Sequence, residues 1–231
     1  MIHSIILAGG KGTRLGADIP KQLLPLGDKP IIRWSVERFH SMEEIDNIII
    51  VSEKNSMAQI KEALPYKLFP KISSFIEGGK ERYDSVFNGL TSQKFSDDDI
   101  VLIHDAARPF VTKEKIKELI KAVCDYGSAA LYTPPSDTIA LWNNGFITEV
   151  PPRDKFRCAQ TPQAFFYKII KEAHDSYRLL KDRQVVTDDV SLVLLNGLKV
   201  KEVPGSTFNL KITSMSDYLI AQLFVREGII Q

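Results

Sequence analysis

Short runs of consecutive apolar residues alternate along the chain with segments in which apolar residues recur every three or four positions. The runs are typical of strands: Ser4–Leu7, Asn47–Val51, Ile72–Ile76, Ile100–Ile103 and Ala129–Thr133; Asn47–Val51 and Ile100–Ile103 are expected to be buried on both faces. The helical spacing predicts helices over Ile31–His40 and Lys113–Tyr126, from about Arg82 and from about Ser216. Gly127 follows the second of these as a C-cap. Strands that alternate with helices predict an α/β fold with a mainly parallel sheet.

This alternation is interrupted after the last of these strands. Thr138–Trp142 and Phe146–Val150 flank Asn143-Asn144-Gly145, which is a β-hairpin signal. A hairpin at this place predicts an arm, over about residues 137–153, that projects from the domain as a surface ornament or as a dimerisation arm. No shift in composition marks a boundary, so residues 1–231 are expected to form a single domain.

The composition narrows the classes of function. Thirty Lys and Arg against 29 Asp and Glu give a net charge of +1, which argues against nucleic-acid binding through bulk charge. No apolar run approaches the roughly 18–20 residues of a membrane span, and the N-terminus carries no basic leader. Cys124 and Cys158 have no metal-like spacing, so we expect buried, reduced thiols in a cytoplasmic protein.

A glycine-rich loop, Leu7 to Gly16, follows the first strand at once. It lacks the Gly-Lys-Ser/Thr ending of a Walker A loop, and Leu15 stands where a dinucleotide fingerprint needs its third glycine. Glycines let backbone N–H groups approach phosphate oxygens, and Arg14 and Lys21 add a forked guanidinium and a point charge. The loop is therefore expected to hold a polyphosphate; the alternative is a simple chain reversal with solvated charges.

Ala8-Gly9-Gly10-x-Gly12-x-Arg14 followed by Pro20-Lys21-Gln22 resembles the signature of the nucleotidyltransferases, and more narrowly that of a cytidylyltransferase family. That family includes the methylerythritol phosphate enzymes of non-mevalonate isoprenoid synthesis and the ribitol phosphate enzymes that make CDP-ribitol for cell-wall polymers. The resemblance continues nearly to the C-terminus in family order, at Gly78–Ser85, His104–Pro109, Thr161–Gln163, Thr187–Asp189 and Asn209–Thr213.

The resemblance implies a Rossmann-like nucleotidyltransferase fold with a projecting β-hairpin arm. It also implies the reaction: a polyol-phosphate oxygen attacks the α-phosphorus of CTP and releases pyrophosphate. Both reactants are anions, so fixed cations and Mg²⁺ would reduce their repulsion and stabilise the charge that develops. In the family the arm crosses to a partner subunit, which implies a homodimer; no nucleic acid and no membrane are expected as partners.

The same resemblance implies roles for individual residues. Those assigned to catalysis are Arg14, Lys21, Arg153 and Lys211. Those assigned to CTP are Leu7, Ala8, Gly9, Gly10, Gly78, Gly79, Arg82, Ser85 and Ala106. Those assigned to the acceptor are Asp105, Arg108, Thr138 and Thr187. Asp105 is also a candidate contact for hydrated Mg²⁺, but without a second acidic ligand the metal is expected mostly on the phosphates. His104 is expected to be a structural imidazole.

Alternatives stay open at this stage. His104–Pro109 and Thr187-Asp188-Asp189-x-Ser191 fit the methylerythritol phosphate enzymes, which we favour as the reading. Leu7–Arg14 and Asn209–Thr213 look closer to the ribitol phosphate enzymes, since the former often have Ala where Gly9 stands. A regulatory module that binds nucleotide without chemistry is a distant alternative. An NAD(P) reductase is disfavoured because no acidic residue ends a strand about 20 residues past the glycines.

Overall fold

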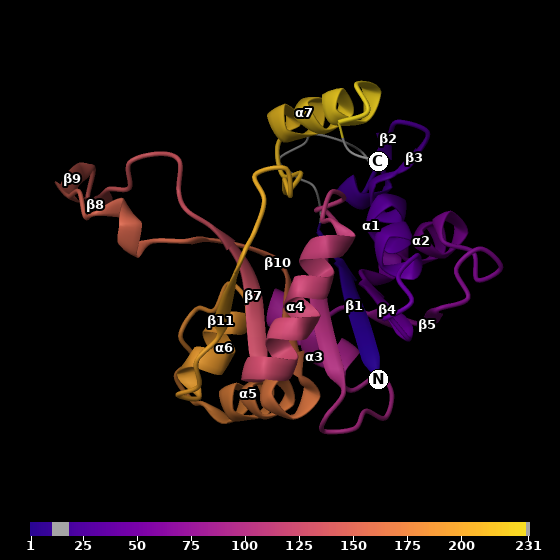
Figure 1. Ribbon diagram of the computed structural model, residues 1–231, viewed down its shortest axis with the longest axis horizontal. Coiled ribbons are helices and arrows are strands. Elements are labelled where there is room, and N and C mark those ends of the chain that lie inside the picture. The colour runs from indigo at the N-terminus through magenta and orange to yellow at the C-terminus, as the bar shows by residue number, and fades with distance from the viewer. Residues whose placement is uncertain (11–18, 230–231) are drawn as a thin grey trace.

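A seven-stranded sheet forms the centre of the computed structural model, which describes residues 1–10 and 19–229 (Figure 1). Its strands are β1 (Ile2–Ala8), β4 (Asn47–Ser52), β5 (Ile72–Glu77), β6 (Ile100–Asp105), β7 (Ser128–Thr133), β10 (Cys158–Phe166) and β11 (Lys201–Pro204). They lie in the order β11-β7-β10-β6-β1-β4-β5. This arrangement confirms the predicted strands, each to within a residue or two.

The sheet is mainly parallel, as predicted. β1 runs parallel to β4 and to β6, β4 to β5, and β7 to β11. β10 is the exception, because it lies antiparallel between β6 and β7. This strand was not predicted; it carries Thr161-Pro162-Gln163 in its middle, and proline within a run is a poor strand signal.

Six helices cover the two faces. α1 (Ile31–His40), α2 (Met57–Ala63) and α4 (Lys113–Tyr126) pack on one face, and α3 (Arg82–Leu90), α5 (Tyr167–Leu179) and α6 (Asp189–Leu195) on the other. The side chains of β4 alternate between these layers: Ile48 and Ile50 join the first core, and Ile49 and Val51 the second. The run of apolar residues in this strand therefore reflects burial on both faces.

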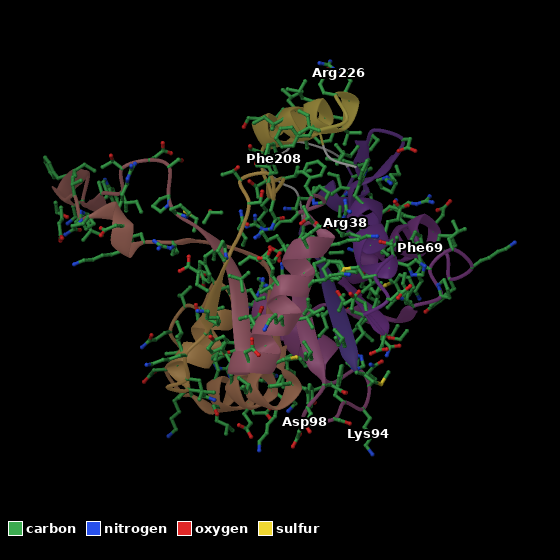
Figure 2. The ribbon with its side chains drawn as sticks, in the orientation of Figure 1. Arg38, Phe69, Lys94, Asp98, Phe208 and Arg226 are labelled. Carbon is green, nitrogen blue, oxygen red and sulfur yellow. The ribbon has the colours of Figure 1, made fainter. Side chains whose placement is uncertain are left out.

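The ends of the predicted helices follow local chemistry. Thr112 accepts a hydrogen bond from the backbone of Lys115 at the start of α4, and Gly127 ends that helix at a φ of +82°. A further helix, α7 (Met215–Arg226), is capped by Ser214, whose hydroxyl accepts from the backbone N–H of Asp217. Figure 2 shows Arg226, on α7, at the opposite end of the molecule from Lys94 and Asp98.

The predicted hairpin is present, with shorter strands than expected. β8 (Leu141–Asn143) pairs with β9 (Phe146–Glu149), and the turn between them has positive φ at both Asn144 and Gly145. These are the angles of the type I′ turn that Asn-Gly favours. Figure 1 shows the hairpin extending away from the sheet, and Trp142 and Phe146 on it are 68% and 74% exposed.

Short elements complete the described part of the chain. β2 (Pro25–Leu26) and β3 (Lys29–Pro30) form a small hairpin, and single 3-10 turns are η2 (Lys21–Leu23), η3 (Lys54–Ser56) and η4 (Arg153–Lys155). The expectation of buried thiols was wrong: Cys124 faces solvent from α4 and Cys158 begins β10, and both are exposed. Among the helices described, none has the length and apolar character needed to cross a bilayer.

Candidate active site

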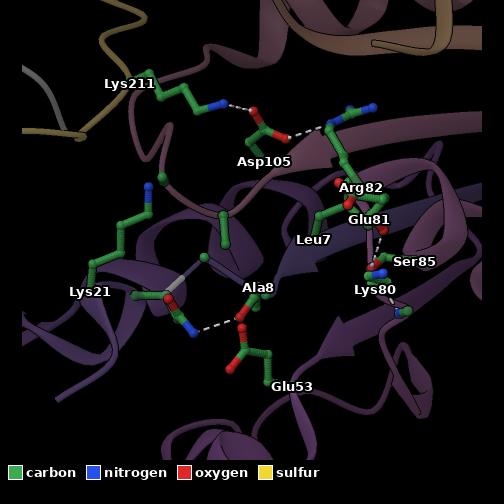
Figure 3. A pocket seen from close by; sticks show the side chains of 16 residues that line it. Leu7, Ala8, Lys21, Glu53, Lys80, Glu81, Arg82, Ser85, Asp105 and Lys211 are labelled. Atoms are coloured by element: carbon green, nitrogen blue, oxygen red, sulfur yellow. Dashed lines mark hydrogen bonds and ion pairs between the residues drawn. The ribbon is translucent and has the colours of Figure 1, made fainter. Parts of the chain in front are cut away.

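A cavity lies at the carboxyl ends of β1 and β6. The chain continues from β1 to β4 on one side and later returns to β6 on the other, so the sheet order reverses between β1 and β6. Ligands of α/β proteins bind outside the strand ends at such a reversal. The cavity has a volume of about 310 Å³ (Figure 3). Its lining includes Leu7, Ala8, Gly9, Gly10, Lys21, Gln22, Glu53, Gly79, Lys80, Glu81, Arg82, Ser85, Asp105, Ala106, Ala107 and Lys211.

The end of β1 forms the floor of this cavity. Gln22, itself buried, donates to the carbonyl oxygen of Ala8 at 2.5 Å and so ties η2 to the end of the strand. A Cβ on Gly10 would lie 2.8 Å from Cε of Lys21, whereas a Cβ on Gly9 would meet no atom of residues 1–10 or 19–229 within 4 Å. The loop therefore keeps Lys21 close to the backbone of Gly10. Arg14, the other cation predicted here, lies outside the described residues.

A second glycine pair closes the opposite wall. The backbone N–H of Gly79 donates to Oγ of Ser85 at 3.0 Å, and a Cβ on Gly79 would lie 2.2 Å from Cβ of Asp84. Ser85 in turn donates to the carbonyl oxygen of Glu81 at 3.2 Å. The turn before α3 is thus so tight that a side chain at position 79 does not fit. Gly78, also assigned to CTP, lies beside this turn but is not part of the cavity lining.

Lys21, Lys80, Arg82 and Lys211 line the cavity, and three of them contact other segments through hydrogen bonds or ion pairs. Lys21 donates to the carbonyl oxygen of Ile212 at 3.2 Å, Lys211 donates to Oδ2 of Asp105 at 2.6 Å, and Nε of Arg82 lies 3.5 Å from Oδ1 of Asp105. Figure 3 shows Lys211, Asp105 and Arg82 in a row, with Lys21 on the same side as Lys211. Segments that are far apart in sequence therefore place cations around one space.

Asp105 is held ionised between these cations. Burial alone would raise the pKa of its carboxyl group, but the charges of Arg82 and Lys211, and then of Arg108, lower that pKa far below its ordinary value. A carboxylate that remains ionised at every ordinary pH is a poor proton acceptor. Asp105 can therefore orient cations or hydroxyl groups, but it is not suited to general base catalysis.

A smaller cavity of about 210 Å³ adjoins the first. Arg82, Asp105 and Lys211 line both cavities, so their charged row forms the wall between them. The smaller cavity is completed by Arg108, Ala159, Gln160, Thr161, Gln163, Thr187 and Asp188. The site thus offers two adjoining compartments with a shared charged boundary.

Arg108 links three segments. Its Nη1 donates to the carbonyl oxygen of Asn209 at 2.8 Å and its Nη2 to that of Ala159 at 3.2 Å. The side-chain amide of Asn209 donates to the carbonyl oxygen of Thr161 at 2.9 Å. Burial lowers the pKa of Arg108. These bonds hold the segment that carries Lys211 against β10 and the loop after β6.

His104 has the structural role that we expected from the sequence. Its ring is fully buried; Nε2 lies 3.1 Å from the carbonyl oxygen of Arg108 and Nδ1 lies 3.2 Å from Oγ1 of Thr161. Oγ1 of Thr161 also accepts from the backbone N–H of Asp105 at 3.1 Å. Burial lowers the pKa of His104 to about 4, so a neutral imidazole fixes the loop on which Asp105 and Arg108 stand.

Two predicted residues lie away from both cavities. Arg153 is in η4 at the base of the arm, where it donates to the carbonyl oxygen of Ser136 at 3.0 Å, and Thr138 is exposed on the other side of the arm's base. The remaining predicted residues in the described part, Gly78 apart, line one or both cavities. Within one chain, the structure does not bring Arg153 and Thr138 to the site.

The sequence reasoning missed the acidic and amide residues behind the site. Gln163 donates to Oδ2 of Asp188 at 2.8 Å and accepts from the backbone of Asp189 at 3.0 Å, and Asp189 is fully buried against Arg82. Thr161–Gln163 and Thr187–Asp189 were recognised as motifs, but which acid is buried depends on the position of α6 against α3 and α5. No local spacing carries that information.

The described residues contain no group of three His, Cys, Asp or Glu side chains arranged to hold a metal ion. Both oxygens of Asp105 lie against cations, Arg82 at Oδ1 and Lys211 at Oδ2. The protein therefore does not fit a metal cage of its own at this place, and a divalent ion here would need oxygens from a ligand.

Comparison with known proteins agrees with this fold and site. The family model of 2-C-methyl-D-erythritol 4-phosphate cytidylyltransferase matches residues 2–227. The enzyme of that name from Clostridium perfringens strain SM101 is 42% identical over 226 residues, 97% of this chain and 99% of the relative. Its namesake from Clostridium botulinum strain Loch Maree is 40% identical over 219 residues, 94% of each chain.

Solved structures give the same result. The crystal structure of 4-diphosphocytidyl-2C-methyl-D-erythritol synthase from Anaerococcus prevotii superposes with a TM-score of 0.84 at 27% identity, over 98% of this chain and 96% of that one. The crystal structure of the Francisella tularensis 2-C-methyl-D-erythritol 4-phosphate cytidylyltransferase superposes with a TM-score of 0.80 at 29% identity, over 96% of this chain and 98% of that one. The fold, the paired cavities and these similarities define a nucleotidyltransferase enzyme. Within that class, the chain belongs to the 2-C-methyl-D-erythritol 4-phosphate cytidylyltransferase family.

Proposed function

We propose that the protein transfers CMP from CTP to 2-C-methyl-D-erythritol 4-phosphate and releases pyrophosphate. An oxygen of the acceptor phosphate forms a bond to the α-phosphorus while the bond from that phosphorus to the bridging oxygen of the β-phosphate breaks. CTP occupies the larger cavity against Gly79, Arg82, Ser85 and Ala106, and the acceptor occupies the smaller one against Arg108 and Thr187.

The observation that supports this proposal best is the shared wall of the two cavities. Lys211 and Arg82 lie at the boundary across which the new bond forms, and Lys21 lies against the glycine loop. Fixed cations there reduce the repulsion between the reactants and stabilise the charge on the α-phosphoryl and pyrophosphate groups. They are already positioned by protein contacts, so little reorganisation is needed.

The attacking group needs no strong base. A phosphate monoester has its second pKa near ~6, so at neutral pH most of the acceptor already carries a dianionic, nucleophilic phosphate. This agrees with the lowered pKa of Asp105, which keeps that carboxylate ionised. We assign Asp105 to orienting Lys211 and an acceptor hydroxyl, and the catalytic groups to Arg14, Lys21, Lys211 and a partner's Arg153.

Mg²⁺ is part of this proposal as a ligand of the triphosphate. It would be held mainly by phosphate oxygens and water, as this ion prefers, and no protein cage is assigned to it. Its chemistry would be to neutralise charge on the nucleotide and the leaving pyrophosphate.

The arm and the protein's setting complete the proposal. We propose that residues 137–153 are an arm of a single domain that crosses to a second copy of the chain, because its exposed Trp142 and Phe146 need an apolar partner. In that dimer Arg153 and Thr138 would reach the neighbour's acceptor cavity. A cytoplasmic location, expected from the cysteine content, belongs to the proposal too.

Product analysis with two acceptors in competition tests the proposed function. The protein is incubated with CTP, Mg²⁺ and equal amounts of methylerythritol phosphate and ribitol phosphate, and pyrophosphate and both CDP-polyols are measured. We expect the methylerythritol product in large excess. An excess of CDP-ribitol would move the protein to the second acceptor, and CTP binding without pyrophosphate from either acceptor would indicate a regulatory module.

A further inference from the structure

A row of alternating charges runs from the cavity wall into the core. Lys211 donates to Asp105, Asp105 lies beside Nε of Arg82, and Nη1 of Arg82 donates to Oδ2 of Asp189 at 2.6 Å. Oδ1 of Asp189 lies 3.2 Å from Nε2 of His174. Side-chain exposure is 39% at Lys211, 11% at Asp105 and 27% at Arg82, and it is 0% at Asp189 and His174, which end the row in the core.

The burial of Asp189 is not explained by its place at the start of α6. The capping role belongs to Asp188, whose Oδ1 accepts from the backbone of Ser191 at 3.0 Å. A carboxylate with no exposure to solvent is costly unless it is paired and hydrogen-bonded. Arg82 and His174 supply those partners, and Gln163 fixes the backbone by accepting from the N–H of Asp189. The carboxylate is therefore held by side chains of α3 and α5, while β10 holds the backbone of the residue that carries it.

Asp105 and Asp189 hold Arg82 in different ways. Asp105 lines both cavities, so phosphate oxygens that enter either cavity compete with it for Lys211 and Arg82. Asp189 lines neither cavity. Nη2 of Arg82, also buried, has no hydrogen-bond partner among the described residues. One edge of the guanidinium is thus bound to a fixed anion, whereas its Nε lies beside a carboxylate that lines both cavities.

We propose that Asp189 is a positioning residue for nucleotidyl transfer, which fixes the guanidinium of Arg82 in the wall between the two cavities while His174 orients the Asp189 carboxylate. This inference rests on the proposed function, which assigns Arg82 to the nucleotide. It predicts that Asp189 acts on the reaction through Arg82 and through no other group.

A double-mutant cycle tests this dependence. Asp189→Asn keeps the shape of the side chain and removes its charge; we expect kcat/KM for CTP to fall roughly 10- to 100-fold, because small displacements of a positioning group are costly. In Arg82→Gln, kcat/KM for CTP should fall by at least the same factor. The double variant R82Q/D189N should be no slower than Arg82→Gln alone. Losses that multiply in the double variant would overturn the proposal.

A matched control separates positioning from stability. Tyr177 lies on α5 one turn after His174 and donates to the carbonyl oxygen of Gln184 at 2.7 Å, away from both cavities. Tyr177→Phe should lower the unfolding temperature and leave kcat and KM unchanged. Asp189→Asn with the same kinetics as Tyr177→Phe would show that Asp189 is structural only.

A measurement without substrate keeps this proposal separate from the proposed function. In ¹⁵N spectra of arginine side chains, the ion pair should slow rotation of the Arg82 guanidinium and resolve its Nη signals, which Arg82→Gln identifies by their loss. Asp189→Asn should merge them; resolved signals in that variant would refute the positioning role even if the enzyme had another acceptor. If Asp189→Asn does not fold, His174→Phe is the second variant, and it should merge the Arg82 Nη signals and lower kcat/KM several-fold. Wild-type signals and kinetics in His174→Phe would count against the proposal.

Discussion

The ammonium group of Lys211 lies 2.6 Å from Oδ2 of Asp105, a residue 106 positions earlier in the chain. This pair connects the segment before α7 to the end of β6, and it places a protein carboxylate where the proposed reaction brings phosphate oxygens. The same carboxylate lies beside Arg82. In the proposed reaction, entry of substrate would therefore exchange one anionic partner of these cations for another.

Lys21→Ala should lower kcat by about 10²- to 10³-fold while the affinity for CTP changes much less, because a fixed cation is worth most where charge develops. Steady-state kinetics and equilibrium titration with CTP measure the two effects. Lys121→Ala, an exposed lysine of α4, is the control and should behave as wild type. Unchanged kcat in Lys21→Ala would contradict the role of Lys21.

Gly79→Ala should abolish detectable CTP binding or the stability of the turn, since its Cβ would lie 2.2 Å from Cβ of Asp84. Gly9→Ala in the facing loop is the matched comparison, and it should keep kcat and KM within about two-fold because a Cβ there meets no atom of the described residues within 4 Å and leaves the backbone N–H in place. Isothermal titration with CTP compares the two. Equal loss in both variants would mean that backbone approach at Gly9, and not only at Gly79, is required by the nucleotide.

Arg153→Ala should raise the KM for the acceptor while CTP binding persists. If Arg153 serves a neighbour's site, mixing equal amounts of Arg153→Ala and Lys211→Ala subunits should restore activity in about a quarter of the sites. About half of the dimers are then mixed, and one of the two sites in each mixed dimer is complete. Lys155→Ala, in the same turn, is the control. No recovery in the mixture would place Arg153 in its own subunit's site or in none.

Deletion of Thr138–Val150 should convert dimers to monomers, as measured by light scattering, because it removes the exposed apolar side chains Trp142 and Phe146. Circular dichroism should show that the remaining α/β body stays folded. A dimer that survives the deletion would show that the arm is a surface ornament.

The free energy of unfolding should decrease as the pH is lowered, because unfolding then allows His104 to bind a proton. Its pKa is about 4 in the folded protein and near 6.5 when unfolded, so the unfolded chain binds more protons between these values. The free energy of unfolding should therefore fall by about 3 kcal/mol from this group as the pH drops from 6.5 to 4. Urea unfolding across this pH range should show that the free energy of unfolding depends less steeply on pH in His104→Gln than in the wild type. Parallel curves for the two proteins would indicate that His104 is protonated in the folded state.

Residues that signal by local pattern were predicted well from the sequence. The apolar run Asn47–Val51 and the spacing in Lys113–Tyr126 depend on nearest neighbours along the chain, and both became the expected elements. The Asn144-Gly145 turn has the same character, because its positive φ angles are a property of those two residues. Nearly all of the described residues assigned to CTP also line the larger cavity, although their contacts with nucleotide stay predictions.

The features that were not predicted from the sequence depend on contacts between distant segments. β10 is defined by its two neighbours, β6 and β7, and not by its own composition. The burial of Asp189 requires α6 to pack beside α3 and α5, and the exposure of Cys158 follows from its place at the base of the arm. A single sequence carries no local signal for such arrangements, so the support behind Arg82 was not foreseen.

The link from Arg108 and Asn209 to Lys211 also bears on biosynthesis. During translation the glycine loop, β6 and both neighbouring layers emerge first, and Lys211 is among the last parts of the site to be made. A nascent chain still attached at about residue 205 would hold most of the nucleotide cavity without the lysine of its wall. Catalytic competence should therefore arrive only after Lys211 has left the ribosome and paired with Asp105, late and in a single step.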